Sequence, residues 1–333
     1  MLVGYILKRC VQIIPLILAI SVIVFVIIQL PPGDYLTTYI RQLELSGTEV
    51  SQSQIENMKR LYSLDKPMYI QYLYWMKNII TKGDLGRSFS RSLPVTEVIG
   101  ERIGATMLLS LTTLILTNLI SIPVGIYSAI RQYSVFDYIF MFVGFIGMAV
   151  PGFLIALFII YMIFKYTGNA ITGLFSQEYQ TAPWSWAKFV DMLQHVWVAL
   201  LVIGLSGTAG GIRSMRALLL DELQKQYVIT ARSKGVQENK LLWKYPIRMA
   251  LNPMMSTIGW MLPGLISGET IVSIVLNLPT SGPVLFAALT AQDMYLAGGF
   301  LIITSCLTVL GTLISDIALA LIDPRIRFGG VGE

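Results

Sequence analysis

Residues 213–253 read RSMRALLLDELQKQYVITARSKGVQENKLLWKYPIRMALNP and lie between two long apolar segments. This stretch contains eight Lys or Arg residues and three Asp or Glu residues. Charges are costly in the hydrocarbon of a bilayer, so the stretch must emerge into water. Short loops rich in Lys and Arg stay on the cytoplasmic side of a membrane. We therefore predict a cytoplasmic loop here. The side of the membrane on which this loop lies sets the orientation of the helices around it.

The composition of the whole chain is that of a membrane protein. Of its 333 residues, 55% are hydrophobic and only 13% are charged, whereas an ordinary soluble domain carries about 25% charged residues. The net charge of +5 is explained by basic cytoplasmic loops and does not indicate nucleic-acid binding. A membrane-spanning helix needs about 20 apolar residues. We predict an all-α protein with six transmembrane helices, one within 1–30 and the others at 105–130, 138–164, 195–211, 254–276 and 296–322.

The charged residues outside these spans predict the topology. Lys8 and Arg9 precede the first span, Arg131 lies in the turn after the second, and Arg325 and Arg327 follow the last. This distribution places both termini in the cytoplasm. The chain thus divides into an N-terminus with the first helix (1–30), an extracytoplasmic loop or scaffold (31–101), and a core of five helices (102–333) that includes 213–253.

The predicted external loop is expected to be ordered. Residues 50–64 have helical apolar spacing after a capping Ser, and 68–80 carry aromatic residues typical of a membrane interface. GDLGRS, at 83–88, predicts a turn in which two glycines supply unusual backbone angles.

Several spans contain residues that interrupt helices or are costly in lipid. Pro123 with Gly125, Pro151, and Pro263 predict breaks, and these breaks are candidate hinges. Glu269 lies within a span, where a carboxylate costs about 3 kcal/mol or more and usually faces a cavity or a partner. Two interpretations remain open for Glu269, a residue of the transport pathway or gate, and a structural carboxylate at a helix break; Asp316 has the same ambiguity.

The basic loop is predicted to fold as two short helices around Gly235. In residues 217–235, Leu220, Leu223, Tyr227 and Ala231 recur at helical steps and form one apolar face. Gly235 is a typical residue after a helix end, because it tolerates the left-handed conformation. The second helix is expected to place three basic residues on one face, which would contact either lipid phosphates or a partner protein: Lys240, Lys244 and Arg248.

Enzymatic and metal chemistry find little support in the sequence. The chain has no GxxxxGK[ST] phosphate-binding loop and no GxSxG nucleophile motif. One histidine (His195) and two cysteines (Cys10 and Cys306) do not supply the ligands of an ordinary zinc site. We predict a protein that is not an enzyme, and we interpret His195 as a structural residue.

Motifs along nearly the full length resemble the first permease of the dipeptide/oligopeptide family of ABC importers, which also includes nickel transporters. They occur in the family's order and comprise LKRCVQIIP (7–15), LPPGD (30–34), GDLGRS (83–88), PVTEVIGERIGATMLLS (94–110), PVGIYSAIRQYSVFDY (123–138), AVPGF (149–153), YVITARSKGV (227–236), IRMALNP (247–253), SGETIV (267–272) and DPRIRFG (323–329).

This resemblance implies a type I ABC-importer permease fold in the plasma (inner) membrane of a prokaryote. The implied partners are a second permease, two ATP-binding cassette subunits that hold ATP and Mg, an external solute-binding protein and membrane lipid, with no cofactor on this chain. Peptides are the implied substrate, with oligosaccharides and, less favoured, nickel as alternatives. A stand-alone ion-coupled secondary transporter is the alternative from another class, but it is expected to need several membrane carboxylates and inverted repeats, which the sequence does not contain.

The resemblance also implies roles for particular residues. The family's coupling motif begins Glu-Ala-Ala, whereas this chain has Ile229, Thr230 and Ala231 there, followed by Gly235 at the expected spacing. The predicted contact with the ATPase centres on Ala231 and Gly235, with Thr230 and Arg232 beside them, and the coupling loop also includes Asp221 and Tyr227. The candidates for the pathway or its gate come from their places within the spans and not from the resemblance, and they are Glu269, Pro151 and Pro263.

Overall fold

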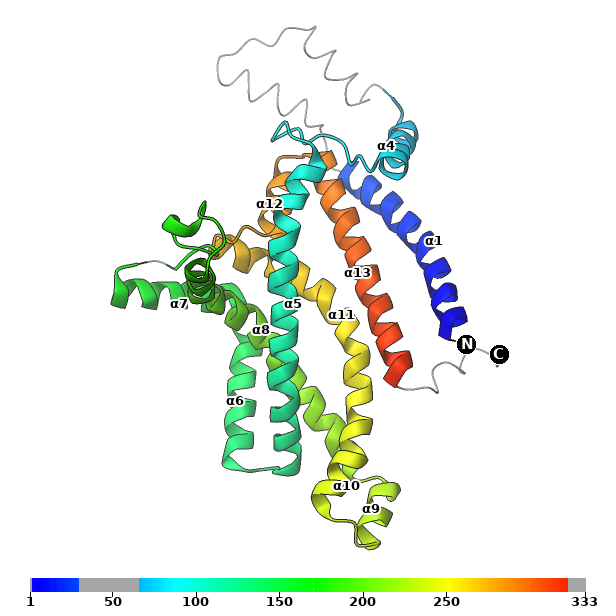
Figure 1. Cartoon of the computed structure of the whole chain (residues 1–333), viewed down its shortest axis with the longest axis vertical. Coiled ribbons are helices and arrows are strands. Elements are labelled where there is room, and N and C mark those ends of the chain that lie inside the picture. The colour runs from blue at the N-terminus through cyan, green and yellow to red at the C-terminus, as the bar shows by residue number, and fades with distance from the viewer. Residues whose placement is uncertain (1, 30–65, 170, 323–333) are drawn as a thin grey trace. The chain divides into compact units, whose positions relative to one another are not determined.

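A computed structural model describes residues 2–29, 66–169 and 171–322 (Figure 1). Across these ranges the protein is helical, and its one isolated β-bridge joins Arg87 to Pro94. This confirms the predicted all-α class. The helices are α1 (Leu2–Gln29), α4 (Met68–Lys82), α5 (Val95–Ile130), α6 (Val135–Ala149), α7 (Gly152–Thr167), η1 (Gln177–Tyr179), α8 (Trp186–Leu223), α9 (Gln226–Ser233), α10 (Glu238–Lys244), α11 (Pro246–Val275), α12 (Ser281–Thr290) and α13 (Met294–Ile322).

Several helices are long and apolar enough to cross a bilayer. Among the described residues these are α5, α8 and residues Met294–Leu313 of α13, and the bent pair α6–α7 adds a fourth crossing if it is one span. The chain is therefore a multi-pass membrane protein. The count of six spans stays a prediction, as do the predicted helix at 50–64 and the basic tail after 322, which lie outside the described residues.

Only one of the three predicted proline breaks interrupts a helix. α6 and α7 meet at Val150 and Pro151 with a bend of 102°. By contrast, α5 continues through Pro123 and Gly125, and α11 continues through Pro263, so those two predictions were wrong. Membrane helices tolerate proline where neighbouring groups compensate the lost hydrogen bond. Gly125 has a packing reason instead, because a Cβ there would lie 2.6 Å from the Cβ of Met215 on α8.

The chain forms two compact units, and the first comprises Met1–Arg9, Thr106–Gly282 and Thr308–Glu333. In this unit α8 contacts α6, α7, α9 and α11. Its contact with α5 is close because small residues face each other: a Cβ on Gly204 would lie 3.3 Å from Thr117 Oγ1, and one on Gly211 would lie 2.6 Å from Ser121 Oγ. Such small residues let membrane helices approach closely. α8 is thus the central helix of this unit.

The second unit comprises Cys10–Ala105 and Pro283–Leu307. The buried side chains of Val95, Leu296 and Phe300 lie in its main apolar cluster. Trp75 of α4 is buried and donates its indole N–H to the carbonyl of Leu85 at 3.0 Å. α4 therefore packs onto the loop that follows it.

The GDLGRS turn adopts the backbone that its glycines predict. Gly83 has φ +65° and Gly86 has φ +96°, which confirms the interpretation of 83–88. Gly86 also meets a side chain, because a Cβ there would lie 2.6 Å from the Tyr295 ring. Both the left-handed conformation and the close approach favour glycine.

Candidate coupling site

The basic stretch 213–253 folds into the end of α8, two short helices and the start of α11 (Figure 1). The two short helices predicted around Gly235 are confirmed as α9 and α10, but the predicted apolar face over 217–235 is interrupted, because α8 ends at Leu223 and α9 begins at Gln226. Lys225 between them has extended backbone angles (φ −73°, ψ 147°). The chain therefore turns at Lys225, between α8 and α9, and again at residues 234–237, between α9 and α10. As a result, α9 and α10 form a compact helical hairpin. Below, α9, residues 234–237 and α10 are called the hairpin.

Glu222 fastens the beginning of the hairpin to α8. Its carboxylate accepts hydrogen bonds from the ammonium of Lys225 and from the hydroxyl of Tyr227. Burial and the hydrogen bond to Glu222 raise the pKa of Tyr227 above its ordinary value of 10.0, so Tyr227 stays a protonated donor at neutral pH. This contact holds the first turn of α9 against the last turn of α8.

Gly235 ends α9 in a conformation that other residues rarely adopt. Its φ is +75°, its N–H donates to the carbonyl of Arg232 at 3.0 Å, and the N–H of Val236 donates to the carbonyl of Ala231 at 3.3 Å. This pair of bonds is the Schellman motif, which satisfies carbonyls at a helix end. The prediction of a glycine helix end at Gly235 is confirmed.

An ion pair closes the hairpin across this turn. Arg232 donates from Nε to Oε2 of Glu238 at 3.1 Å and from Nη2 to Oε1 at 2.6 Å. The hydrogen bond from Arg232 lowers the pKa of Glu238 below its ordinary value of 4.5, against a smaller opposing effect of burial. Both side chains are about half exposed, at 50% and 52%. Such pairs contribute about 0–1 kcal/mol, so this contact orients the two helices more than it stabilises them.

The hairpin has a buried side and an exposed side. Val228 of α9 and Leu241 of α10 are fully buried, and Leu242 packs in a cluster with Met215, Leu219 and Ile247. The predicted contact residues lie on the other side or at its edge: Thr230, Arg232, Gly235, Asp221 and Tyr227 are exposed and Ala231 is half-buried. The structure therefore places five of these residues on one accessible element, the hairpin, and Asp221 in the last turn of α8.

The predicted basic stripe is only partly present. Lys240, Lys244 and Arg248 are all exposed, but α10 ends at Lys244 and α11 begins at Pro246. Tyr245 between them has φ −119° and ψ −80°, which no helix continues through. Arg248 therefore belongs to another helix, and the prediction of one continuous stripe was wrong.

Comparisons with known proteins agree with this architecture. The family described as "Binding-protein-dependent transport system inner membrane component" matches residues 121–328, and the N-terminal part of such membrane components matches residues 1–112. The chain belongs to this family.

Relatives and a solved structure extend the match over most of the membrane component. The chain is 35% identical over 326 residues to the oligopeptide transport system permease protein AppB of Bacillus subtilis, covering 98% of this chain and 99% of that one. It is 32% identical over 314 residues to a putative peptide permease protein of Brucella suis, covering 94% and 95%. A structure of the MetNI methionine ABC transporter in inward-facing conformations matches 68% of this chain and 97% of its own with a TM-score of 0.50 and 12% identity, a likeness of fold alone.

The pathway candidates of this membrane component lie away from the hairpin along their helices. Helices rise about 1.5 Å per residue, so α6 ends about 21 Å from its start, just before Pro151, and Glu269 lies about 35 Å from the start of α11. Pro151 is exposed at the 102° bend. The side chains of Glu269, Pro263 and Asp316 lie outside the described part of the structure, so their roles stay predictions.

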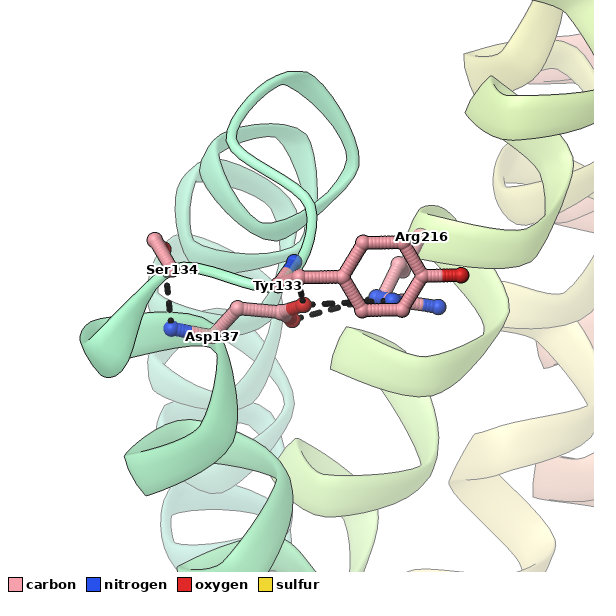
Figure 2. A network of polar contacts seen from close by, with 4 residues as sticks. All are labelled: Tyr133, Ser134, Asp137 and Arg216. Atoms are coloured by element: carbon pink, nitrogen blue, oxygen red, sulfur yellow. Dashed lines mark hydrogen bonds and ion pairs between the residues drawn. The ribbon is translucent and has the colours of Figure 1, made fainter.

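Besides the pair of Arg232 with Glu238, two polar contacts of this region were not predicted from the sequence. One is the attachment of Tyr227 and Lys225 to Glu222, and the other is the ion pair of Asp137 with Arg216 (Figure 2). A local signal existed for the first, because Glu222, Lys225 and Tyr227 are close in sequence. For the second, the only local signal was the spacing of Ser134 and Asp137, in which Ser134 Oγ accepts the N–H of Asp137 and caps α6.

Proposed function

We propose that this chain is a transmembrane permease subunit of an ATP-driven importer that takes up peptides delivered by an external solute-binding protein. The full-length similarity to an oligopeptide transport permease supports peptides as the substrate. Family membership supports the dependence on a binding protein. In this proposal the chain has six spans with both termini in the cytoplasm, binds no cofactor and catalyses no reaction itself.

The complex would contain this chain, a second permease, two ATP-binding cassette subunits that bind ATP and Mg, and the binding protein. The two permeases line a pathway that opens alternately to each side of the membrane. ATP-driven closure of the cassette subunits displaces the hairpin, and this displacement changes the accessible side. Glu269, Pro151 and Pro263 are the residues of this chain proposed to lie at the pathway or its gate.

The observation that carries the proposal is the shape of the hairpin. Exposed Thr230 and Gly235 face outward, while buried Val228 and Leu241 fix its inner side. Contacts at Glu222 and Arg232 join α9 to α8 and to α10. An element that is accessible yet firmly attached can transmit a displacement from a partner to the helices behind it.

Cross-linking tests the assignment of the hairpin. With Cys10 and Cys306 replaced by serine, Thr230→Cys should cross-link to a cassette subunit in the purified complex. Tyr166→Cys is the matched control, since Tyr166 is exposed at the end of α7, and it should not cross-link. Equal cross-linking at both positions, or none at Thr230→Cys, would contradict the assignment.

The ligand retained by the cognate binding protein tests the substrate. Mass spectrometry of the purified binding protein should identify peptides. A bound oligosaccharide or a nickel ion would overturn the substrate but leave the architecture of the importer intact.

A further inference from the structure

A buried ion pair joins α6 to α8. Arg216 donates from Nε to Oδ1 of Asp137 at 3.1 Å and from Nη2 to Oδ2 at 3.1 Å (Figure 2). Asp137 is only 2% exposed, and the Arg216 side chain is 20% exposed. The same carboxylate accepts the backbone N–H of Tyr133 at 3.0 Å. One carboxylate therefore connects the α5–α6 turn, the first turn of α6 and the last part of α8.

Arg216 lies close to the attachment of the hairpin. Along α8 it is about 10 Å from the end of the helix at Leu223. Its neighbours Met215 and Leu219 are fully buried and belong to the cluster that holds Leu242 of α10. Glu222, on the same helix end, holds α9. A displacement of the hairpin therefore reaches α8 at the turns that carry Arg216.

α6 leads from this ion pair to the helix break. Asp137 is in its first turn, and the helix ends at Ala149, about 18 Å further on. There the chain bends by 102° at Val150 and Pro151 into α7. α6 also packs along α8. It can thus act as a lever with one end fixed to α8 by the ion pair and the other end at the bend.

The energetics of buried ion pairs indicate that this pair contributes more to the position of α6 on α8 than to the stability of the fold. Desolvation offsets most of their attraction, and apolar replacements of both partners are often neutral or stabilising. An arginine that grips a carboxylate with two parallel bonds, however, fixes both distance and orientation. The apolar contacts of α6 with α8, such as the approach of Gly147 to Leu205, lack the directional bonds of this pair. Removal of the ion pair should therefore release the register of α6 on α8 without unfolding the unit.

We propose that Asp137 and Arg216 are positioning residues that make α6 follow α8 when the hairpin is displaced, and so carry the displacement to the bend at Pro151. This inference rests on the proposed function, since it requires a partner that displaces the hairpin. Neither residue touches the partner or the substrate, and both act through the helices that they join.

The test separates transmission from stability with a doubly neutral variant. Either single change leaves one charge without its partner, the partly buried Arg216 in Asp137→Asn or the buried Asp137 in Arg216→Gln, and should lower the unfolding temperature. The double variant Asp137→Asn/Arg216→Gln has no buried charge there and should recover much of that loss. The matched control is Arg213→Gln, which removes a positive charge from an exposed residue one turn earlier on α8.

The complete importer is reconstituted in liposomes with its binding protein and a radiolabelled tryptic digest of casein as the peptide probe. We measure assembled complex, ATP hydrolysis and peptide uptake. The double variant should assemble and hydrolyse ATP, while uptake per ATP hydrolysed falls at least about fivefold. The Arg213→Gln control should keep the normal ratio.

Two outcomes would overturn the inference. If the double variant keeps the normal ratio, the pair has no role in transmission. If it fails to assemble, the pair is needed for the fold itself. The Thr230→Cys cross-link is measured in the same variants: its presence with an unchanged ratio refutes only this inference, whereas its absence in the otherwise native protein refutes the proposed hairpin contact.

Discussion

The hydroxyl of Ser88 donates a hydrogen bond of 2.6 Å to Oδ2 of Asp293, a residue 205 positions later in the chain. Both residues are completely buried. Ser90 adds two more bonds to the same oxygen, from its N–H at 2.9 Å and its hydroxyl at 2.8 Å. Oδ1 of Asp293 accepts the N–H of Leu296 and caps α13. This carboxylate therefore fastens the loop after α4 to the start of α13.

Replacing Asp293 should destabilise the second unit. Asp293→Ala leaves Ser88 and the N–H of Ser90 without their buried acceptor, at a cost of about 2–3 kcal/mol. The measurement is the thermal unfolding midpoint in detergent. Asp84→Ala is the control, because its exposed carboxylate accepts the N–H of Gly86 within its own turn; an equal drop in both variants would argue against a special role for Asp293.

Replacing Gly235 should affect coupling more than folding. A Cβ there would meet no atom within 4 Å, but its φ of +75° is strained for other residues, by about 1–2 kcal/mol. Gly235→Val should lower peptide uptake per ATP hydrolysed while part of the complex still assembles. Gly235→Asn should be milder, because Asn tolerates this conformation.

Gly168 provides the matched control for this strain. It caps α7 with φ +72°, and a Cβ at this position would likewise meet no atom within 4 Å. Gly168→Val should therefore lower stability to a similar extent without changing the ratio of uptake to hydrolysis. Unchanged coupled uptake in Gly235→Val would refute the contact assigned to the hairpin.

The close contact between α5 and α8 predicts opposite effects at two adjacent glycines. In Gly211→Ala the new methyl group would lie 2.6 Å from Ser121 Oγ and 2.7 Å from its Cβ, and such overpacking costs about 1–3 kcal/mol. Gly210→Ala meets nothing within 4 Å and should gain up to about 1 kcal/mol of helix propensity. Unfolding midpoints of the two variants check this, and a loss at Gly210 as large as at Gly211 would contradict the packing.

The pairing of Arg232 with Glu238 predicts a pH dependence of the hairpin. Because the folded-state pKa of Glu238 is lowered below 4.5, its contribution is complete above the unfolded pKa and is lost as pH falls through the folded pKa. A spin label on Lys234→Cys should therefore become more mobile as the pH falls through the lowered pKa of Glu238, below its ordinary value of 4.5. In Glu238→Gln the label should be mobile at neutral pH as well, and a label that is equally immobile in both proteins would contradict the role of this pair.

Features that depend on local sequence were predicted well. Helix formation depends on apolar length and on spacing within a few residues. The all-α class could therefore be predicted from the sequence alone. The turn at 131–134 and the left-handed conformations of Gly83, Gly86 and Gly235 were accessible for the same reason. Failures occurred where packing overrides local preference: Pro123 and Pro263 lie within continuous helices, and the helix predicted through Lys225 is broken there.

By itself, the sequence determined the helical class, the membrane setting and the position of the exposed hairpin, because hydrophobicity and charge act residue by residue. Only the tertiary structure decided that Asp137 pairs with Arg216 and that Asp293 holds Ser88, across 79 and 205 residues. A carboxylate in a sequence carries no information about which distant donor will reach it. That choice is made by the packing of helices, which also holds the hairpin of the basic stretch 213–253 against the end of α8 and the start of α11.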